Sequence, residues 1–154
     1  MRVAVFADTH GVLFRLSAAI AKIEPVDAFL HLGDHGNDAQ EIARALPVPY
    51  YAVRGNCDLL PGLPNERVVE FDGARILMLH GHRQASIYQM ADMAEEKGCG
   101  AVLFGHTHQP LLMAQGSVLI LNPGSLSQPR GGSRLSFALL TIEHGDVNAR
   151  LIAL

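Results

Sequence analysis

The chain has 154 residues, of which 49% are hydrophobic and 18% charged, so a single folded globular domain spanning residues 1–154 is expected. The formal net charge is −3, and no run of Lys or Arg marks a basic face. This pattern argues against an extended nucleic-acid-binding surface and against binding to an anionic membrane. It leaves open a small phosphate-containing substrate, because bound metal ions would supply positive charge locally.

The number of cysteines and the lengths of the apolar runs argue against several further classes of protein. Cys57 and Cys99 are too few for a disulfide framework or a four-thiolate zinc site. No apolar run approaches the roughly 20 residues that span a bilayer, and Met1 leads directly into a strand-like segment without the pattern of a signal peptide. We therefore expect a cytoplasmic protein with no membrane partner. Its oligomeric state is open, and a homo-oligomer is compatible with these features.

The first half of the chain alternates between strand and helix patterns. Strands are predicted at 2–7, 28–32 and 50–53, and helices with one apolar face at 16–23 and 39–46. Pro25 and Pro47 follow the two helical patterns and end them. This β-α-β-α-β order predicts a parallel sheet with right-handed crossovers, in which functional groups gather beyond the carboxyl ends of the strands.

The second half is richer in strands. A hairpin is predicted at Asp72-Gly73, between strands at 67–71 and 75–79. A third helix has its apolar face on 87–94 and ends before Gly98. Further strands are predicted at 101–104, 111–114, 118–121, 135–139 and 147–151. We therefore predict an α/β fold with two sheets, the first mainly parallel and the second more antiparallel, with helices outside and the site along one edge.

Side chains that bind metals follow five of the predicted strands. The segments are Asp8-Thr9-His10, Gly33-Asp34, Gly55-Asn56-Cys57-Asp58, His80-Gly81-His82 and Gly105-His106-Thr107-His108. In extended backbone, residues two apart point the same way, so His106 and His108 can address one small volume. Any one of these segments can simply cap a turn, but five in one chain are hard to explain as chance.

The donor types indicate a pair of divalent ions. Aspartate oxygens and neutral imidazole nitrogens suit Mn²⁺, Fe²⁺, Ni²⁺ or Zn²⁺, and no thiolate set selects zinc alone. Two ions roughly 3.5–4 Å apart need one bridging carboxylate and separate outer ligands. Asp34 is the natural bridge, with Asp8 and His10 on one ion and Asn56 and His80 on the other.

The order of these motifs resembles the calcineurin-like metallophosphoesterase superfamily. More narrowly, Gly55-Asn56-Cys57-Asp58, His80-Gly81-His82 and Asn122-Pro123-Gly124-Ser125 are similar to its small bacterial and archaeal phosphodiesterases. The resemblance covers nearly the whole chain. It implies a four-layer α/β/β/α sandwich with two mixed β-sheets, and hydrolysis of phosphodiester bonds by attack of a metal-bridging hydroxide.

Carried over residue by residue, the resemblance assigns seven metal ligands. The first ion would be held by Asp8, His10, Asp34 and His108, and the second by Asp34, Asn56, His80 and His106. Mn²⁺ is the metal expected, with Ni²⁺, Fe²⁺ and Zn²⁺ as alternatives. The resemblance also favours His80 over its neighbour His82 as the ligand.

Further residues are expected to act around the ligands. Asp34, Asn56 and Asp58 are predicted to be catalytic, with Asp58 orienting a ligand histidine through its second ring nitrogen. His82, Cys57 and Arg130 are expected to support the ligands or to contact the substrate. Many members of the superfamily have a histidine at the position of Cys57, where it protonates the leaving oxygen, so the source of that proton is open here.

Two alternatives to a phosphodiesterase remain. One is a phosphomonoesterase or a dinucleoside polyphosphate hydrolase, although the short chain offers few insertions to shape a nucleotide pocket. The other is a non-catalytic scaffold for protein interactions, because some relatives keep this fold and lose ligands. All seven ligand positions are filled here, which favours the enzyme.

Overall fold

The computed structural model describes residues 1–23, 25–59 and 61–154. Within these residues the strands are β1 (Arg2–Phe6), β2 (Ala28–His31), β3 (Tyr50–Ala52), β4 (Glu66–Phe71), β5 (Ala74–Leu79), β6 (Ala101–Leu103), β7 (Leu111–Gln115), β8 (Val118–Asn122), β9 (Ser136–Glu143) and β10 (Asp146–Ala153). The helices are α1 (Leu16–Ile20), α2 (Asp38–Ala45) and α3 (Ile87–Glu96). The predicted order of elements is confirmed, with boundaries that differ by a few residues.

Among the helices, the largest boundary difference is in the first one. It begins at Leu16 as expected but ends at Ile20, and its last turn tightens into bonds from the amides of Lys22 and Ile23 to carbonyls three residues earlier. Ile23 still packs with the apolar face of the helix. The spacing of apolar residues therefore identified the buried face correctly but overestimated the length of the regular helix.

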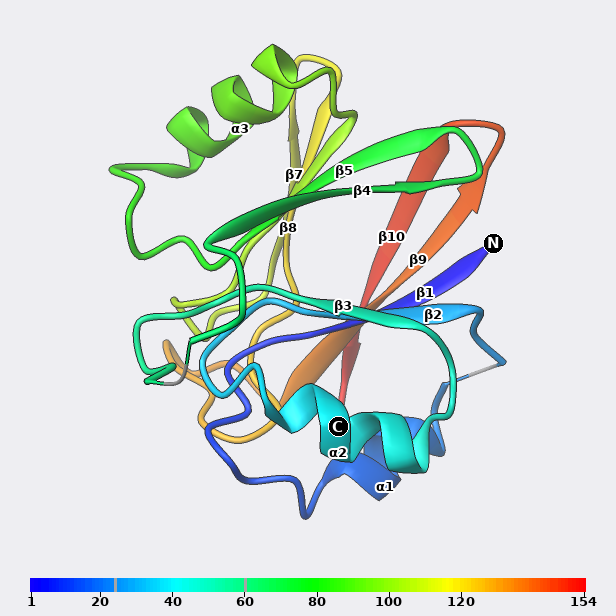
Figure 1. Ribbon diagram of the computed structural model, residues 1–154, viewed down its shortest axis with the longest axis vertical. Helices are drawn as coiled ribbons and strands as arrows, with labels where there is room; N and C mark the ends of the chain where they lie inside the picture. The colour runs from blue at the N-terminus through cyan, green and yellow to red at the C-terminus, as the bar shows by residue number, and fades with distance from the viewer. Residues whose placement is uncertain (24, 60) are drawn as a thin grey trace.

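The first sheet has the strand order β10-β9-β1-β2-β3 (Figure 1). Strands β1, β2 and β3 are parallel, as the β-α-β-α-β pattern predicts, with Val5 opposite Leu30 and Leu30 opposite Tyr51. Strand β9 pairs antiparallel with β1, and β10 pairs antiparallel with β9. The C-terminal hairpin therefore extends the first sheet.

The second sheet has the order β4-β5-β6-β8-β7. Strands β5, β6 and β8 are parallel, and β4 and β7 add antiparallel edges. The predicted hairpin at Asp72-Gly73 joins β4 to β5, and both residues have positive φ (46° and 81°). Such angles are those of the tight turns that match the twist of a hairpin.

The division of strand types between the sheets differs from the prediction. Each sheet has two parallel and two antiparallel pairs, so both are mixed. The reason is that β9 inserts beside β1 as an inner strand, and its first five residues are buried on both faces instead of alternating. Alternation is the signature of a half-exposed strand, and an inner strand does not show it.

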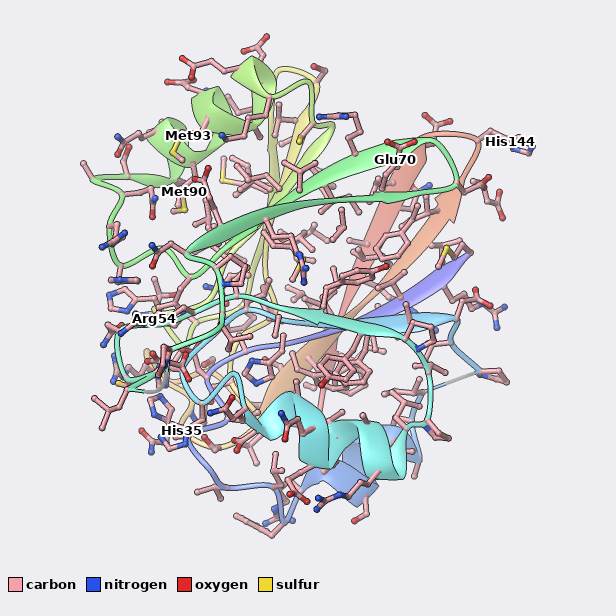
Figure 2. The ribbon with its side chains drawn as sticks, in the orientation of Figure 1. His35, Arg54, Glu70, Met90, Met93 and His144 are labelled. Carbon is pink, nitrogen blue, oxygen red and sulfur yellow. The ribbon has the colours of Figure 1, made fainter. Side chains whose placement is uncertain are left out.

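Three apolar clusters separate four layers of structure, which confirms the α/β/β/α sandwich. One cluster lies between the sheets and joins Val5 and Leu30 to Ile76 and Leu103. The second joins the outer face of the first sheet to α1 and α2. The third joins the outer face of the second sheet to α3, on which Met90 and Met93 are visible in Figure 2. Figure 1 shows α1 and α2 on one side of the molecule and α3 on the other.

The loops that follow β1, β2, β3, β5 and β6 leave the sheets at one edge, on the left in Figure 1. These loops carry Asp8, Asp34, Asn56, His80 and His106. No helix among residues 1–23, 25–59 and 61–154 is long and apolar enough to cross a membrane.

Candidate metal centre

Three of the five strand-end loops, those after β1, β2 and β6, hold an unusual backbone conformation. Among the described residues, eight that are not glycine have positive φ, and six of these lie in the loops: Asp8, His10, Asp34, His35, His106 and His108. A left-handed conformation costs an L-residue roughly 1–2 kcal/mol. Strain of this kind collects where the surrounding structure holds a residue for a function.

Glycines allow the loops to approach one another closely. A Cβ at Gly33 would lie 2.7 Å from the backbone nitrogen of Gly55 and 2.9 Å from Nδ1 of His80, and one at Gly55 would collide with Asp34. Glycine thus precedes Asp34 and Asn56 in the sequence because two neighbouring strand ends meet there without room for a side chain.

The first group of donor atoms comes from Asp8, His10, Asp34 and His108. One ligand atom of each lies within 4.8 Å of all the others. Nε2 of His10 is 3.2 Å from Nε2 of His108 and 3.6 Å from Oδ2 of Asp34. Nε2 of His108 lies 3.5 Å from Oδ1 of Asp8. Two carboxylates and two imidazoles therefore face one small volume.

The second group comes from Asp34, Asn56, His80 and His106. Oδ1 of Asn56 lies 3.1 Å from both Nε2 of His80 and Nδ1 of His106. Nε2 of His80 is 3.3 Å from Oδ1 of Asp34. The two oxygens of Asp34 thus face different groups, Oδ2 the first and Oδ1 the second.

Backbone carbonyls fix the orientation of two of the rings. Nδ1 of His80 lies 2.8 Å from the carbonyl oxygen of Leu32, and Nδ1 of His108 lies 2.6 Å from that of Gln128. A carbonyl only accepts, so each Nδ1 carries the proton. The lone pair of the neutral ring is then on Nε2 and points into the group of donor atoms, as in a metal-ligating histidine.

The Asp8 carboxylate provides a direct test of whether the residues suit a metal. Asp8 is fully buried, and its Oδ2 has no hydrogen-bond partner among the described residues. A buried carboxylate oxygen without a partner is costly, and a cation would satisfy it. The mixed oxygen and nitrogen donors are those of a divalent transition metal.

Residues 1–145 match the calcineurin-like phosphoesterase superfamily domain. The chain belongs to this superfamily. The probable metallophosphoesterase YsnB of Bacillus subtilis is 30% identical over 97% of this chain and 89% of its own length. Phosphodiesterase YfcE of Escherichia coli K12 is 30% identical over 58% of this chain and 50% of its own length. A crystal structure of Vps29 from Entamoeba histolytica in complex with Zn²⁺ is similar in fold, with a TM-score of 0.80, 22% identity and 99% of each chain covered.

The superfamily's motifs are built into one polar framework around Asp8. The Asn122-to-Ser125 segment closes it: the Asn122 side-chain amide donates to the carbonyl of Gly105 at 2.7 Å, and the Ser125 hydroxyl donates to the carbonyl of Asp8 at 2.7 Å. Ser127 donates to the same carbonyl at 2.9 Å. These bonds tie the loop after β8 to those after β1 and β6.

The two buried carboxylates have opposite electrostatic environments. Burial raises the pKa of Asp8 to about 7, against the opposing charge of His80. Burial also acts to raise the pKa of Asp34, but the neighbouring His80 ring and the hydrogen bond from the backbone N–H of Cys57 outweigh it and lower that pKa. Asp34 therefore stays ionised to lower pH than Asp8 does.

The ligand histidines also differ in the direction of their pKa shifts. Burial lowers the pKa values of His10, His106 and His108, so these rings are neutral near pH 7 and can donate a lone pair. His80 is the exception: burial acts to lower its pKa, but the hydrogen bond with Asp34 and the charge of Asp8 raise it.

These shifts predict that metal affinity falls in acid. A metal needs Asp8 as a carboxylate, and a proton with a pKa of about 7 competes with it as the pH falls. From pH 8 to pH 6, Asp8 alone should weaken Mn²⁺ binding about tenfold, and the raised pKa of His80 acts in the same direction. Calorimetric titration in two buffers of different ionisation enthalpy measures both affinity and proton release. Affinity that is constant over this range, with no proton released, would contradict the assignment.

Asp58 has a different structural role from the one predicted. Among the described residues, its carboxylate makes no hydrogen bond or ion pair with a ligand histidine. Instead, Oδ2 accepts from the amides of Gly55 at 2.7 Å and Asp34 at 3.1 Å, and Oδ1 accepts from Gly36 at 2.8 Å. The second ring nitrogens of His80 and His108 bind backbone carbonyls, so no carboxylate is needed at those two rings. Asp58 thus ties together the loops that carry Asp34 and Asn56.

The residues expected around the ligands lie at the rim of the site. The His82 ring is 5.4 Å from the His80 ring between centroids, so His80 is the one within the second group. Cys57 is exposed, and its backbone N–H donates to Oδ1 of Asp34 at 2.8 Å. Arg130 is exposed; its amide donates to the carbonyl of His108 at 3.2 Å, and its charge lowers the pKa of Asp8.

Two further histidines near Asp34 differ in environment. His31 is fully buried, burial lowers its pKa to about 4, and its Nε2 lies 3.0 Å from the hydroxyl of Thr9. It is therefore a neutral structural residue. His35 is exposed, with its ring 5.6 Å from that of His10. Figure 2 shows His35 at the edge of the molecule where the loops gather, far from His144 in the β9–β10 turn.

Proposed function

We propose that residues 1–154 form a single-domain, metal-dependent phosphodiesterase with two divalent ions. The observation that supports it most is the position of Asp34. Its Oδ2 lies 3.6 Å from His10 and its Oδ1 lies 3.3 Å from His80, so one carboxylate serves two groups of donor atoms. That is the arrangement expected of a bridging ligand.

In this proposal, the first ion is held by Asp8, His10, Asp34 and His108, and the second by Asp34, Asn56, His80 and His106. When bound, two such ions would acidify a water molecule and neutralise the charge of a phosphate. Mn²⁺ is the proposed metal, with Ni²⁺, Fe²⁺ and Zn²⁺ as alternatives that the same donors accept.

The chain's own residues would prepare and limit this chemistry. The hydrogen bonds from Asp58 hold the loops of Asp34 and Asn56 at a fixed separation. Arg130, exposed beside His108, would contact a phosphate oxygen of the substrate. The name of YfcE supports a diester as the substrate class. We propose that the protein acts in the cytoplasm.

The direct test is reconstitution of the metal-free protein with Mn²⁺, Ni²⁺, Fe²⁺ or Zn²⁺. Each form is then assayed with bis(4-nitrophenyl) phosphate, 4-nitrophenyl phosphate and a dinucleoside polyphosphate. We expect hydrolysis only with metal, and kcat/KM highest for the diester. A higher kcat/KM for the monoester or the polyphosphate would establish the corresponding alternative. Metal binding without hydrolysis of any substrate would favour a scaffold.

The leaving group is expected to control the rate, because Cys57 is a poor proton donor. Burial raises the pKa of its thiol, and a thiol is a weak hydrogen-bond donor. Nitrophenyl diesters should therefore react much faster than alkyl diesters, and Cys57→Ala should change turnover little. Cys57→His should accelerate only substrates with poor leaving groups, by roughly 10²–10⁴-fold.

A leaving-group series on the wild type and Cys57→Ala measures this dependence. The rate should fall steeply with rising leaving-group pKa in both proteins. A shallow dependence in the wild type that becomes steep in Cys57→Ala would mean that the thiol does donate the proton.

A further inference from the structure

A pocket lined mainly by residues with polar side chains opens directly beside the second group of donor atoms. It has a volume of about 250 Å³ and shares His80 with that group. Its other lining residues come from the start of β4 and from the loop between β5 and α3: Asn65, Glu66, Gly81, His82, Arg83 and Gln84. None of these residues is assigned a role in holding the metals.

Several polar groups of this pocket have no partner. Among the described residues, the side chains of Asn65, Arg83 and Gln84 make no hydrogen bond or ion pair, and Nδ1 of His82 is buried without a hydrogen bond. Glu66, the acidic residue of the pocket, is already engaged by Lys97 at 3.0 Å. A buried nitrogen without a partner is unusual in a folded protein and indicates a group that a ligand completes.

The composition of the pocket defines the chemistry of that ligand. Arg83 offers only donors and a permanent positive charge, which suits a phosphate or carboxylate. Asn65 and Gln84 offer both donors and acceptors, which suit hydroxyl groups. An alkyl or aryl group would offer these side chains neither a hydrogen-bond partner nor an opposite charge.

We propose that this pocket binds one ester substituent of the substrate, and that this substituent is polar and carries a negative charge, as a sugar phosphate does. The inference rests on the proposed function, because the scissile phosphate would lie at the metal centre while its substituent extends past His80. Arg83 is then a residue that determines specificity, and it takes no part in the reaction itself.

Binding of two nucleotides that contain no phosphodiester bond tests the pocket directly. Thymidine 3′,5′-bisphosphate and thymidine 5′-phosphate differ by one phosphate, and their dissociation constants for the Mn²⁺-loaded protein are measured by calorimetry. The wild type should bind the bisphosphate at least about tenfold more tightly. Arg83→Gln should abolish this difference and Arg83→Lys should restore part of it. Arg44→Gln is the matched control, because it removes the same charge from an exposed residue paired with Glu41 on α2.

The inference is overturned if Arg83→Gln keeps the preference for the bisphosphate, or if the wild type has none. Because Arg83 is exposed, the variant should fold, and its metal content is measured in parallel. The kinetic counterpart compares a 4-nitrophenyl ester of thymidine 5′-phosphate with and without a 3′-phosphate, and the ratio of their kcat/KM values should fall about tenfold in Arg83→Gln.

The binding and kinetic experiments separate the two proposals. Binding of the bisphosphate that depends on Arg83, in a protein that hydrolyses no ester, would leave the pocket standing and refute the enzyme. Metal-dependent hydrolysis in which Arg83→Gln changes neither the ratio of dissociation constants nor the ratio of kcat/KM values would support the enzyme and refute the pocket.

Discussion

Asp34→Asn is expected to lower kcat/KM by roughly 10³-fold or more. It should also reduce the metal content from about two ions per chain to one or fewer. Oδ1 of Asp34 accepts a hydrogen bond from the amide of Cys57, so the asparagine should keep its oxygen there and turn its NH₂ group toward His10. An amide nitrogen does not bind the metal. The first ion should therefore be lost and the second bound more weakly.

Metal analysis of the purified variant, together with its kcat/KM for a nitrophenyl diester, measures both effects. Asp92→Asn is the matched control, since Asp92 is exposed on α3 and, within residues 1–23, 25–59 and 61–154, its carboxylate has a hydrogen bond from Gln115 alone. Two tightly bound ions in Asp34→Asn would exclude Asp34 as the shared ligand.

Asp58→Ala is expected to be strongly destabilising, although Asp58 contacts no metal ligand side chain. Its carboxylate accepts from three buried amides, and each amide left without a partner costs roughly 1–3 kcal/mol. The free energy of unfolding of the metal-free protein should therefore fall by about 3 kcal/mol or more. Asp58→Asn can keep one accepting oxygen and should lose less.

Chemical denaturation of the metal-free proteins isolates this effect from metal binding. Asp92→Ala provides the control for loss of an exposed carboxylate. Both Asp58 variants should also bind Mn²⁺ more weakly, because the loops of Asp34 and Asn56 lose their common anchor. An Asp58→Ala protein within about 0.5 kcal/mol of the wild type would contradict this role.

Much of the candidate site could be predicted from the sequence, because parallel strands bring their carboxyl ends to one edge. Asp8, Asp34 and Asn56 follow three such strands, and His80 and His106 follow two strands of the second sheet. The spacing of residues within a motif limited which side chains could face the same volume. Chain order thus indicated which loops carry the candidate ligands, and the resemblance to the superfamily supplied the full set of seven.

The supporting contacts could not be predicted in this way. The carbonyls of Leu32 and Gln128 orient two histidines, and a carbonyl has no sequence signature. Asp58 was expected to bind a histidine, but its short distance along the chain from Gly55 allows it to accept from backbone amides instead. The sheet membership of β9 and β10 was also hidden, because periodicity reveals burial but not the neighbouring strand.

The central claim is that one chain holds two metal ions through Asp34. The most direct test is a crystal structure of the Mn²⁺-loaded protein with anomalous scattering measured at the manganese edge. We expect two peaks roughly 3.5–4 Å apart. One should lie among Asp8, His10, Asp34 and His108, and the other among Asp34, Asn56, His80 and His106. A single peak, or a metal bound by His82 in place of His80, would contradict the account.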